Sequence, residues 1–150
     1  MVARRGSMQV REGRPEDRDS ILAFDRIAHS DSERVKFIER ALRSETCLVA
    51  DQDGPIIAYV VLEYTFYDQG FVSMLYVAEA ERRRGVGRNL MREIETRCKT
   101  AKLFTSTNES NGPMKALLGS LGYVPSGVIH NLDPGDPELV YFLDLSGRAA

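Results

Sequence analysis

Four arginines and two glycines stand together in the seven residues Arg82-Arg83-Arg84-Gly85-Val86-Gly87-Arg88. They follow the apolar run Phe71–Val77 and open a segment with helical apolar spacing, Val86, Leu90 and Ile94. The start of a helix leaves about four backbone N–H groups without partners and carries about half a positive charge. Glycine lets an anion approach those N–H groups closely, and arginine adds charge-assisted hydrogen bonds. The segment therefore predicts a diphosphate site.

Three other interpretations of the same residues are weaker. A solvated basic patch would leave arginines opposing the positive end of the helix. A Walker loop needs Lys and then Ser or Thr after its second glycine, whereas Arg88 and Asn89 follow Gly87. A dinucleotide fingerprint needs a third glycine where Leu90 stands, and a strand that opens a βαβ unit. An anion site of another kind is favoured.

Two motifs resemble those of one known family. The pattern Arg82-x-x-Gly85-x-Gly87 after a strand resembles the acyl-CoA pyrophosphate loop of the GNAT superfamily of N-acetyltransferases. Downstream, the run from Asn111 through Met114 to Gly122-Tyr123 is similar to the family's Asn-x-x-Ala-x-x-Leu-Tyr-x-x-x-Gly-Phe segment. The order of expected elements from Met8 onward also matches.

The resemblance implies an α/β (α+β) fold with a GNAT-like mixed, mostly antiparallel central sheet. Six to seven strands and about four helices are expected. The fourth and fifth strands would run parallel and splay apart, with the pantetheine arm of the cofactor in the gap. The chain is predicted to form a single acetyltransferase domain over residues 8–146, preceded by a flexible leader over residues 1–7.

The resemblance also implies an activity and a set of cofactor contacts. Acetyl-CoA would be the cosubstrate, and its acetyl group would pass directly to an amine through a tetrahedral intermediate. No metal is expected. The strand backbone would pair with pantetheine, the loop would hold the pyrophosphate, and Asn111 and Met114 would contact the cofactor. The implied cofactor-binding residues are Leu75, Tyr76, Val77, Arg82, Arg83, Arg84, Gly85, Val86, Gly87, Arg88, Asn111 and Met114.

The sequence departs from the family pattern where protons are handled. Leu118 stands at the place of the family's frequent tyrosine acid, and Ser106 is nearest to the place of its glutamate base. Tyr123 is a weak candidate acid, with core packing as the favoured interpretation. Glu63 interrupts an apolar strand and is a tentative base, because a carboxylate beside a cleft can take a proton from an ammonium.

The acceptor is expected to be the primary amine of a small molecule, such as an amino acid, a polyamine or an aminoglycoside-like compound. Tyr64, Tyr67, Asp68 and Tyr76 are candidates to line its pocket, although tyrosines on strands usually pack. A protein N-terminus or lysine is the alternative acceptor. A non-catalytic acyl-CoA-binding module and a nucleotide-binding module are the rival functions.

The elements that must position these residues follow from apolar periodicity. Helical spacing begins at Pro15 and extends to about Ala28, and Asp31 or Ser32 is predicted to cap a second helix. A third helix starts near Val86, and a fourth is stopped by Gly122. The predicted strands are Met8–Glu12, Thr46–Ala50, Ile56–Thr65, Phe71–Val77, Leu103–Thr107, Tyr123–Leu132 and Glu138–Leu145.

Composition limits the remaining classes. The chain has 150 residues, 20 basic and 22 acidic, which argues against nucleic acid as a partner. The longest apolar run, Ile56–Leu62, is far shorter than the roughly 20 residues of a membrane span. Without a secretory signal, a cytoplasmic location is expected. Cys47 and Cys98 are predicted to be buried, reduced thiols. Many such folds form homodimers, but no pattern here fixes an oligomeric state.

Overall fold

The structure is a computed structural model that describes residues 7–148. The described chain forms two compact units. The N-terminal unit comprises the residues up to Leu62 and Met74–Ile94, and the C-terminal unit comprises Glu63–Ser73 and the residues from Glu95 onward. Of the predicted leader, residues 1–6 lie outside the described residues, and Ser7 is exposed. The single domain over residues 8–146 stays a prediction.

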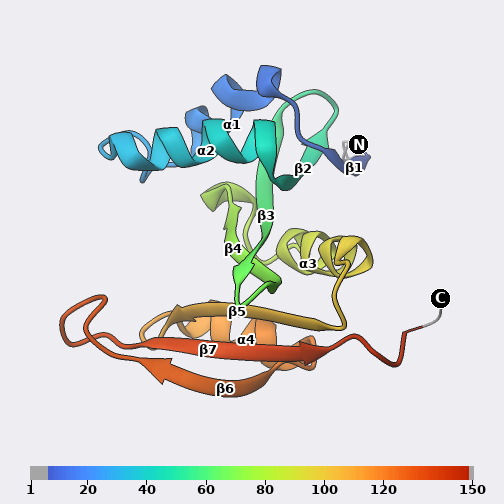
Figure 1. The fold of residues 1–150 in the computed structure, drawn as a ribbon. Coiled ribbons are helices and arrows are strands. Elements are labelled where there is room, and N and C mark those ends of the chain that lie inside the picture. The colour runs from blue at the N-terminus through green and yellow to red at the C-terminus, as the bar shows by residue number, and fades with distance from the viewer. Residues whose placement is uncertain (1–6, 149–150) are drawn as a thin grey trace. The chain divides into compact units, whose positions relative to one another are not determined.

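Residues 7–148 contain seven strands and four α-helices, as expected from the periodicity (Figure 1). Two short 3-10 turns, η1 (Pro15–Asp17) and η2 (Glu79–Glu81), precede α1 and α3. The other elements are β1 (Met8–Glu12), α1 (Arg18–Phe24), α2 (Ser32–Ser44), β2 (Thr46–Gln52), β3 (Ile56–Phe66), β4 (Gln69–Val77), α3 (Val86–Arg97), β5 (Lys102–Asn108), α4 (Gly112–Ser120), β6 (Val124–Ile129) and β7 (Glu138–Asp144).

The sheet is mixed and mostly antiparallel, with the strand order β1-β2-β3-β4-β5-β7-β6. The β4–β5 pair is parallel, and its ladder covers three residue pairs, from Gly70 with Leu103 to Val72 with Thr105. At the last pair, the Thr105 hydroxyl donates to the Val72 carbonyl at 2.9 Å. The predicted sheet, including its parallel fourth and fifth strands, is confirmed.

The first helix ends earlier than its apolar spacing predicts. α1 stops at Phe24, so the prediction of a helix to about Ala28 is wrong. Asp25 is extended, with ψ 96°, and its carboxylate accepts hydrogen bonds from the backbone N–H groups of Ile27 and Ala28. A side chain that satisfies the following N–H groups competes with the helix for them, which ends it. The second predicted start is confirmed, because Asp31 caps α2 through Glu33 and Arg34.

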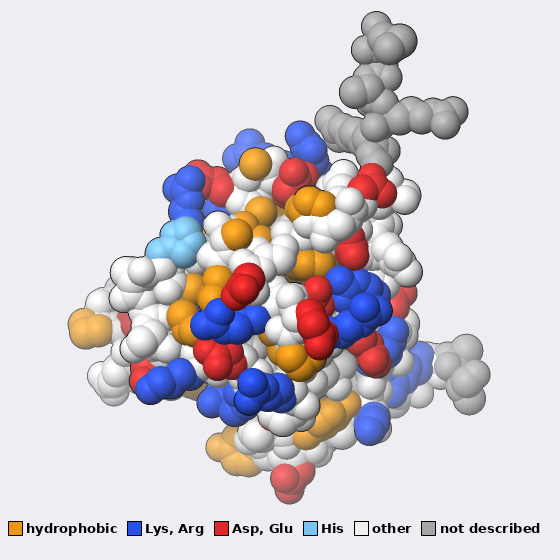
Figure 2. Space-filling model, turned by 90° about the horizontal axis from the view of Figure 1, so that it is seen from above, with side chains coloured by type: hydrophobic (Ala, Val, Ile, Leu, Met, Phe, Trp, Pro, Cys, Tyr) orange, Lys and Arg blue, Asp and Glu red, His pale blue; other side chains and the backbone are white. Residues whose placement is uncertain are grey.

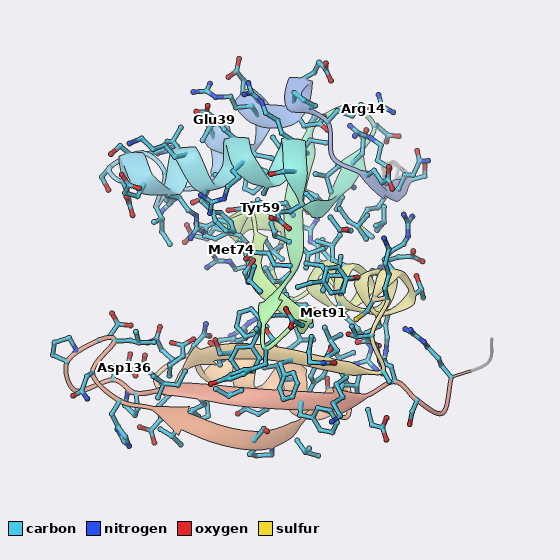
Figure 3. All side chains as sticks on the ribbon, viewed as in Figure 1. Arg14, Glu39, Tyr59, Met74, Met91 and Asp136 are labelled. Carbon is cyan, nitrogen blue, oxygen red and sulfur yellow. The ribbon has the colours of Figure 1, made fainter. Side chains whose placement is uncertain are left out.

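The core of the N-terminal unit lies between α1, α2 and the strands β2 and β3. Its fully buried side chains include Ile21, Ile38, Val49 and Tyr59. Met74 of β4 packs against this cluster, near Tyr59 (Figure 3). The amphipathic spacing of α2 places Ile38, Ala41 and Leu42 on the buried face. This packing fixes the end of β4, from which the candidate loop departs.

In the C-terminal unit, β7 lies between β5 and β6, and α4 lies behind these strands in Figure 1. Alternate residues of β5, such as Leu103 and Thr105, are buried, whereas Phe104 and Ser106 are half-buried. Leu118 and Leu121 supply the buried side of the helix end. Gly122 follows with φ +90°, the left-handed conformation that stops a helix. The last hairpin and the role of Gly122 are confirmed.

The two cysteines are free and buried, as predicted. Burial raises the pKa of the Cys47 thiol to about 12, because the thiolate loses its hydration. A thiol with so high a pKa is a poor nucleophile near neutral pH. Within residues 7–148, no helix is long and apolar enough to cross a membrane. In the same residues, no group of three His, Cys, Asp or Glu side chains is arranged to hold a metal ion.

An ion pair ties β1 to η1 and makes stability depend on acid pH. Both terminal nitrogens of Arg11 donate to the Asp17 carboxylate at 2.9 Å. The hydrogen bond from Arg11 is the main cause that lowers the Asp17 pKa. The folded pKa lies below the unfolded value of about 3.9, so the stabilisation is complete above that pH and is lost as pH falls through the folded pKa.

In urea unfolding from neutral to acid pH, Asp17→Asn should lose less stability than the unmodified chain; parallel curves would contradict this assignment.

Candidate functional site

The loop between β4 and α3 places a helix start in the open. The Asn89 N–H donates to the Gly85 carbonyl at 3.0 Å, which is the first hydrogen bond of α3. The N–H groups of the first turn of a helix, here those of Val86 and Gly87, have no acceptor within the helix itself. They form a donor set at the positive end of a helix of 12 residues. This geometry is suited to an anion with several oxygens.

Gly85 is required by its own backbone. Its φ is +79°, and no heavy atom lies within 4 Å of the position where a Cβ would stand. The conformation favours glycine, and the space in front of it is open. Arg83, two residues earlier, also has a positive φ of 65°, so the chain turns sharply before α3 begins. The structure therefore contains the predicted helix start, with Gly85 directly before α3.

The arginines of the loop differ in what they contact. Arg82, Arg83, Arg84 and Arg88 are all exposed. Arg84 forms an ion pair with Glu81 at 3.1 Å. Arg82 turns back toward β4, where its Nε donates to the Val77 carbonyl at 3.1 Å. Arg82 and Arg84, both predicted to bind the diphosphate, therefore contact different partners within the protein.

Two hydrogen bonds fix the backbone at the end of β4. Leu75, Tyr76 and Val77 are half-buried. The Ala78 N–H donates to the Ile57 carbonyl at 2.7 Å, which keeps the strand end against β3. Together with the bond from Arg82, this fixes the backbone that leads into the loop. The N-terminal unit therefore brings the predicted strand and loop residues together.

Asn111 and Met114 lie at the start of α4, in the C-terminal unit. The Asn111 side-chain oxygen accepts the Met114 N–H at 3.1 Å, so Asn111 is the N-cap of α4. An N-cap residue uses its oxygen for the helix and leaves its other polar atoms for outside partners. Asn111 is exposed and Met114 is half-buried. The cap does not use the Asn111 side-chain nitrogen, which is a donor.

The residues at the family's acid and base places are unsuited to proton transfer. Leu118 is fully buried, and Ser106 is half-buried on β5. The Tyr123 side chain is 3% exposed, and its hydroxyl donates to Glu95 at 3.0 Å. This is the packing that the sequence favours for Tyr123. Glu63, the tentative base, is half-buried on β3.

The aromatic candidates for the acceptor pocket have separate environments. The Tyr64 hydroxyl accepts the Lys99 N–H at 3.0 Å in the C-terminal unit. Tyr67 lies at the tip of the β3–β4 hairpin with 85% of its surface exposed. Tyr76 belongs to the N-terminal unit and stacks with Phe24 and Tyr59. Tyr64 and Tyr67, both in the C-terminal unit, therefore have different environments, and Tyr76 belongs to the other unit.

A buried ion pair in the N-terminal unit is absent from the sequence-based predictions. Asp25 is fully buried, and its carboxylate accepts hydrogen bonds from Arg34 at 2.9 Å and from the Tyr59 hydroxyl at 2.7 Å. Asp25 stands four residues after Ile21, on the apolar face of α1 extended by one turn. A carboxylate on an apolar face is the signal that predicts a buried partner.

Two aspartates of the last hairpin, Asp133 and Asp136, stabilise its turn. Asp133 accepts a hydrogen bond from Asn108 at 2.8 Å, and Asp136 accepts two from Ser110. Asp136 is marked in Figure 3. On the face of the molecule in Figure 2, basic and acidic side chains of the described residues are interspersed. The hydrogen bonds to Asp133 and Asp136 stabilise the loop between β6 and β7.

Comparison with known proteins agrees with this geometry. The family model "Acetyltransferase (GNAT) family" matches residues 15–123. A GNAT-family acetyltransferase from Bacillus cereus has 30% identity and a TM-score of 0.86, covering 93% of this chain and 98% of that one. The ribosomal-protein-S18-alanine N-acetyltransferase of Escherichia coli has 21% identity and a TM-score of 0.78, covering 95% and 97%.

A third solved structure contains a cofactor. It is a proposed acetyltransferase from Salmonella typhimurium with acetyl-CoA, at 19% identity and a TM-score of 0.73, covering 97% of this chain and 98% of that one. No curated protein matches the chain. The match to the family model over most of the sequence, with the Bacillus cereus structure, decides the assignment. The chain belongs to the GNAT family of acetyltransferases.

Proposed function

We propose that this chain transfers the acetyl group of acetyl-CoA directly to the primary amine of a small molecule. The observation that carries the proposal is the helix start of α3, where Gly85 has φ +79° with open space before it and the arginines that flank it are exposed. That donor set matches a diphosphate in charge and in number of acceptors. Membership of the acetyltransferase family makes acyl-CoA the diphosphate to expect.

The proposed cofactor contacts divide by chemistry. The backbone N–H groups at the start of α3 and the side chains of Arg83, Arg84 and Arg88 would bind the diphosphate. The backbone of Leu75–Val77 would pair with the pantetheine amides, and one N–H would polarise the thioester carbonyl. Asn111, through its side-chain nitrogen, and Met114 would bind the arm from α4. The Salmonella typhimurium structure with acetyl-CoA supports this choice of cosubstrate.

The proposed reaction is a direct acyl transfer. The neutral amine attacks the thioester carbon, a C–N bond forms, and the carbonyl oxygen becomes an oxyanion. A fixed N–H donor at that oxygen is worth about 3–4 kcal/mol in comparable acyl transfers. The intermediate collapses as the C–S bond breaks and the CoA thiolate leaves. The proton lost by the ammonium goes to a base, and the thiolate is protonated after departure.

Glu63 is the proposed base, and its replacement should separate catalysis from cofactor binding. Glu63→Gln keeps the shape of the side chain but removes the basic oxygen. We expect kcat/KM for the amine to fall about 100-fold near neutral pH, a typical loss for a general base, while the Kd for acetyl-CoA is unchanged. The rate of CoA thiol release at a series of pH values gives kcat/KM for the amine, and calorimetry gives the Kd for acetyl-CoA.

Glu109→Gln is the matched control, because Glu109 is exposed in the same unit. It should leave both quantities unchanged. A Glu63→Gln variant with unaltered rates at every pH would remove Glu63 from the mechanism. Bulk water would then accept the proton of the ammonium.

The proposed acceptor class is a cationic small amine, namely an amino acid, a polyamine or an aminoglycoside-like compound. The support is the set of acidic and tyrosine side chains on the β3–β4 hairpin, Glu63, Tyr64 and Asp68. A screen of amines with thiol release as the readout tests this. Turnover only with peptides that carry a free N-terminus or lysine would replace the small-molecule acceptor by a protein.

The test of the proposed function as a whole combines binding and turnover. Acetyl-CoA should bind with a Kd in the micromolar range, and at least one amine in the screen should release CoA thiol. Binding without thiol release for any amine would instead support a non-catalytic acyl-CoA-binding module. Competition by ATP at similar affinity would support a nucleotide-binding module. Action in the cytoplasm and pairing into a homodimer remain part of the proposal.

A further inference from the structure

In the N-terminal unit, aromatic and basic side chains pack around the ring of Tyr76. It stacks with Phe24 at 6.2 Å and with Tyr59 at 6.4 Å between ring centroids. Two guanidinium groups also lie over it, Arg34 at 5.3 Å and Arg82 at 5.5 Å from the centroid. A cation over an aromatic face is attracted by the ring quadrupole. Tyr76 therefore contributes more than hydrophobic packing.

The contact with Arg82 concerns the start of the cofactor loop. Arg82 is the first residue of the Arg82–Arg88 segment, and its Nε also donates to the Val77 carbonyl. The guanidinium is thus bound to β4 at two points, a carbonyl and a ring. A side chain held in this way supports the turn before Gly85. It acts on the diphosphate site through the backbone.

The contact with Arg34 concerns the connector between α1 and α2. Arg34 is paired with the buried Asp25, and its Nη2 is buried without a hydrogen-bond partner. The Tyr76 ring offers that guanidinium a π face, which compensates in part for the missing acceptor. The connector thereby depends on the same ring as the loop.

The hydroxyl of Tyr76 makes a third contact, again with the connector. It accepts the Arg26 N–H at 3.3 Å. The Arg26 side chain forms an ion pair with Glu79 at 2.8 Å, on η2 just before the loop. Strand end, loop and connector are therefore joined around one side chain, whose ring and hydroxyl have different partners.

We propose that Tyr76 is a positioning residue for acetyl transfer: its ring holds Arg82 and so the diphosphate loop, and its hydroxyl holds the α1–α2 connector. The inference rests on the proposed function, because it assigns the loop to acetyl-CoA. Arg82 is accordingly a support of the loop, in contrast to its sequence-based role as a direct diphosphate ligand. Tyr76 acts through Arg82 for the cofactor and through Arg26 for the connector.

A double-mutant cycle on the full chain tests the coupling of Tyr76 with Arg82. Tyr76→Leu and Arg82→Gln should each weaken acetyl-CoA binding about tenfold, and the double variant should bind as weakly as either single one. Losses that multiply to about hundredfold in the double variant would show that the two residues act independently. Calorimetry gives the four Kd values, those of the unmodified chain, the two single variants and the double variant. Arg43→Gln, an exposed arginine of α2 with the same charge change, should bind like the unmodified chain.

Tyr76→Phe separates the ring from the hydroxyl and also serves if Tyr76→Leu does not fold. It should keep the acetyl-CoA Kd within about twofold, because the ring face remains. It should lower the midpoint of urea unfolding slightly, because the Arg26 N–H loses its acceptor. A rise in the acetyl-CoA Kd equal to that of Arg82→Gln would overturn the assignment of the ring.

Acetyl-CoA binding and thiol release by the unmodified chain show which of the two proposals has failed. If it gives no heat with acetyl-CoA, the proposed function is contradicted and this inference is contradicted with it. If it binds acetyl-CoA and releases thiol, while the losses of the Tyr76 and Arg82 variants multiply, only the positioning role is wrong.

Discussion

Gly85→Glu is expected to weaken acetyl-CoA binding by about hundredfold or more, the largest effect of any single change on ligand binding. Two causes act together. The φ of +79° disfavours any residue with a Cβ by about 1–2 kcal/mol. The added carboxylate also occupies the open space before the α3 N–H groups and repels a diphosphate there. Calorimetric titration of purified variants with acetyl-CoA measures the loss.

Gly135→Glu is a closely matched control for this prediction. Gly135 has φ +77°, is exposed, and has no heavy atom within 4 Å of its Cβ position. The control carries the same charge change and the same backbone strain, but lies in the turn before β7. It should bind acetyl-CoA normally. Equal losses in the two variants would mean that strain and net charge, and not the loop, explain the effect.

Asp25→Ala is expected to lower the free energy of unfolding by about 3–5 kcal/mol, the cost of leaving one partner of a buried ion pair uncompensated. Asp25 is fully buried, so neither Arg34 nor the Tyr59 hydroxyl would regain its hydration when the carboxylate is removed. The Ile27 N–H would also lose its acceptor, whereas the Ala28 N–H keeps its hydrogen bond to the Asp25 backbone carbonyl. Urea unfolding at neutral pH measures the change.

Two further variants show whether the charge is the cause. Tyr59→Phe removes one hydrogen bond to the carboxylate and should cost less, about 1.5–3 kcal/mol. Asp19→Ala removes an exposed carboxylate of α1 and should leave the unfolding midpoint unchanged. A loss for Asp25→Ala no larger than that for Asp19→Ala would contradict the role of Asp25 in stability.

The sequence predicted the elements well, because each of them buries a face and burial leaves a periodic pattern. The strand Met8–Glu12, the Asp31 cap and the Gly122 stop all depend on residues close in the chain. The end of α1 was beyond such reasoning. It depends on Asp25, whose partners Tyr59 and Arg34 are brought to it by the tertiary fold.

The same division applies to the candidate site. The loop before α3 could be predicted because its glycines and arginines are consecutive and the helix start is local. The direction of the Arg82 side chain could not, because it depends on the carbonyl of Val77 and the ring of Tyr76. The hydrogen bond from Tyr123 to Glu95 joins residues 28 positions apart, which no local pattern specifies.

The most direct test of the central claim is a crystal structure of this chain with coenzyme A. The claim predicts diphosphate oxygens within hydrogen-bond distance of the N–H groups of Val86 and Gly87, with the Arg82 guanidinium still on the Val77 carbonyl. Coenzyme A bound elsewhere, with water at the start of α3, would contradict it.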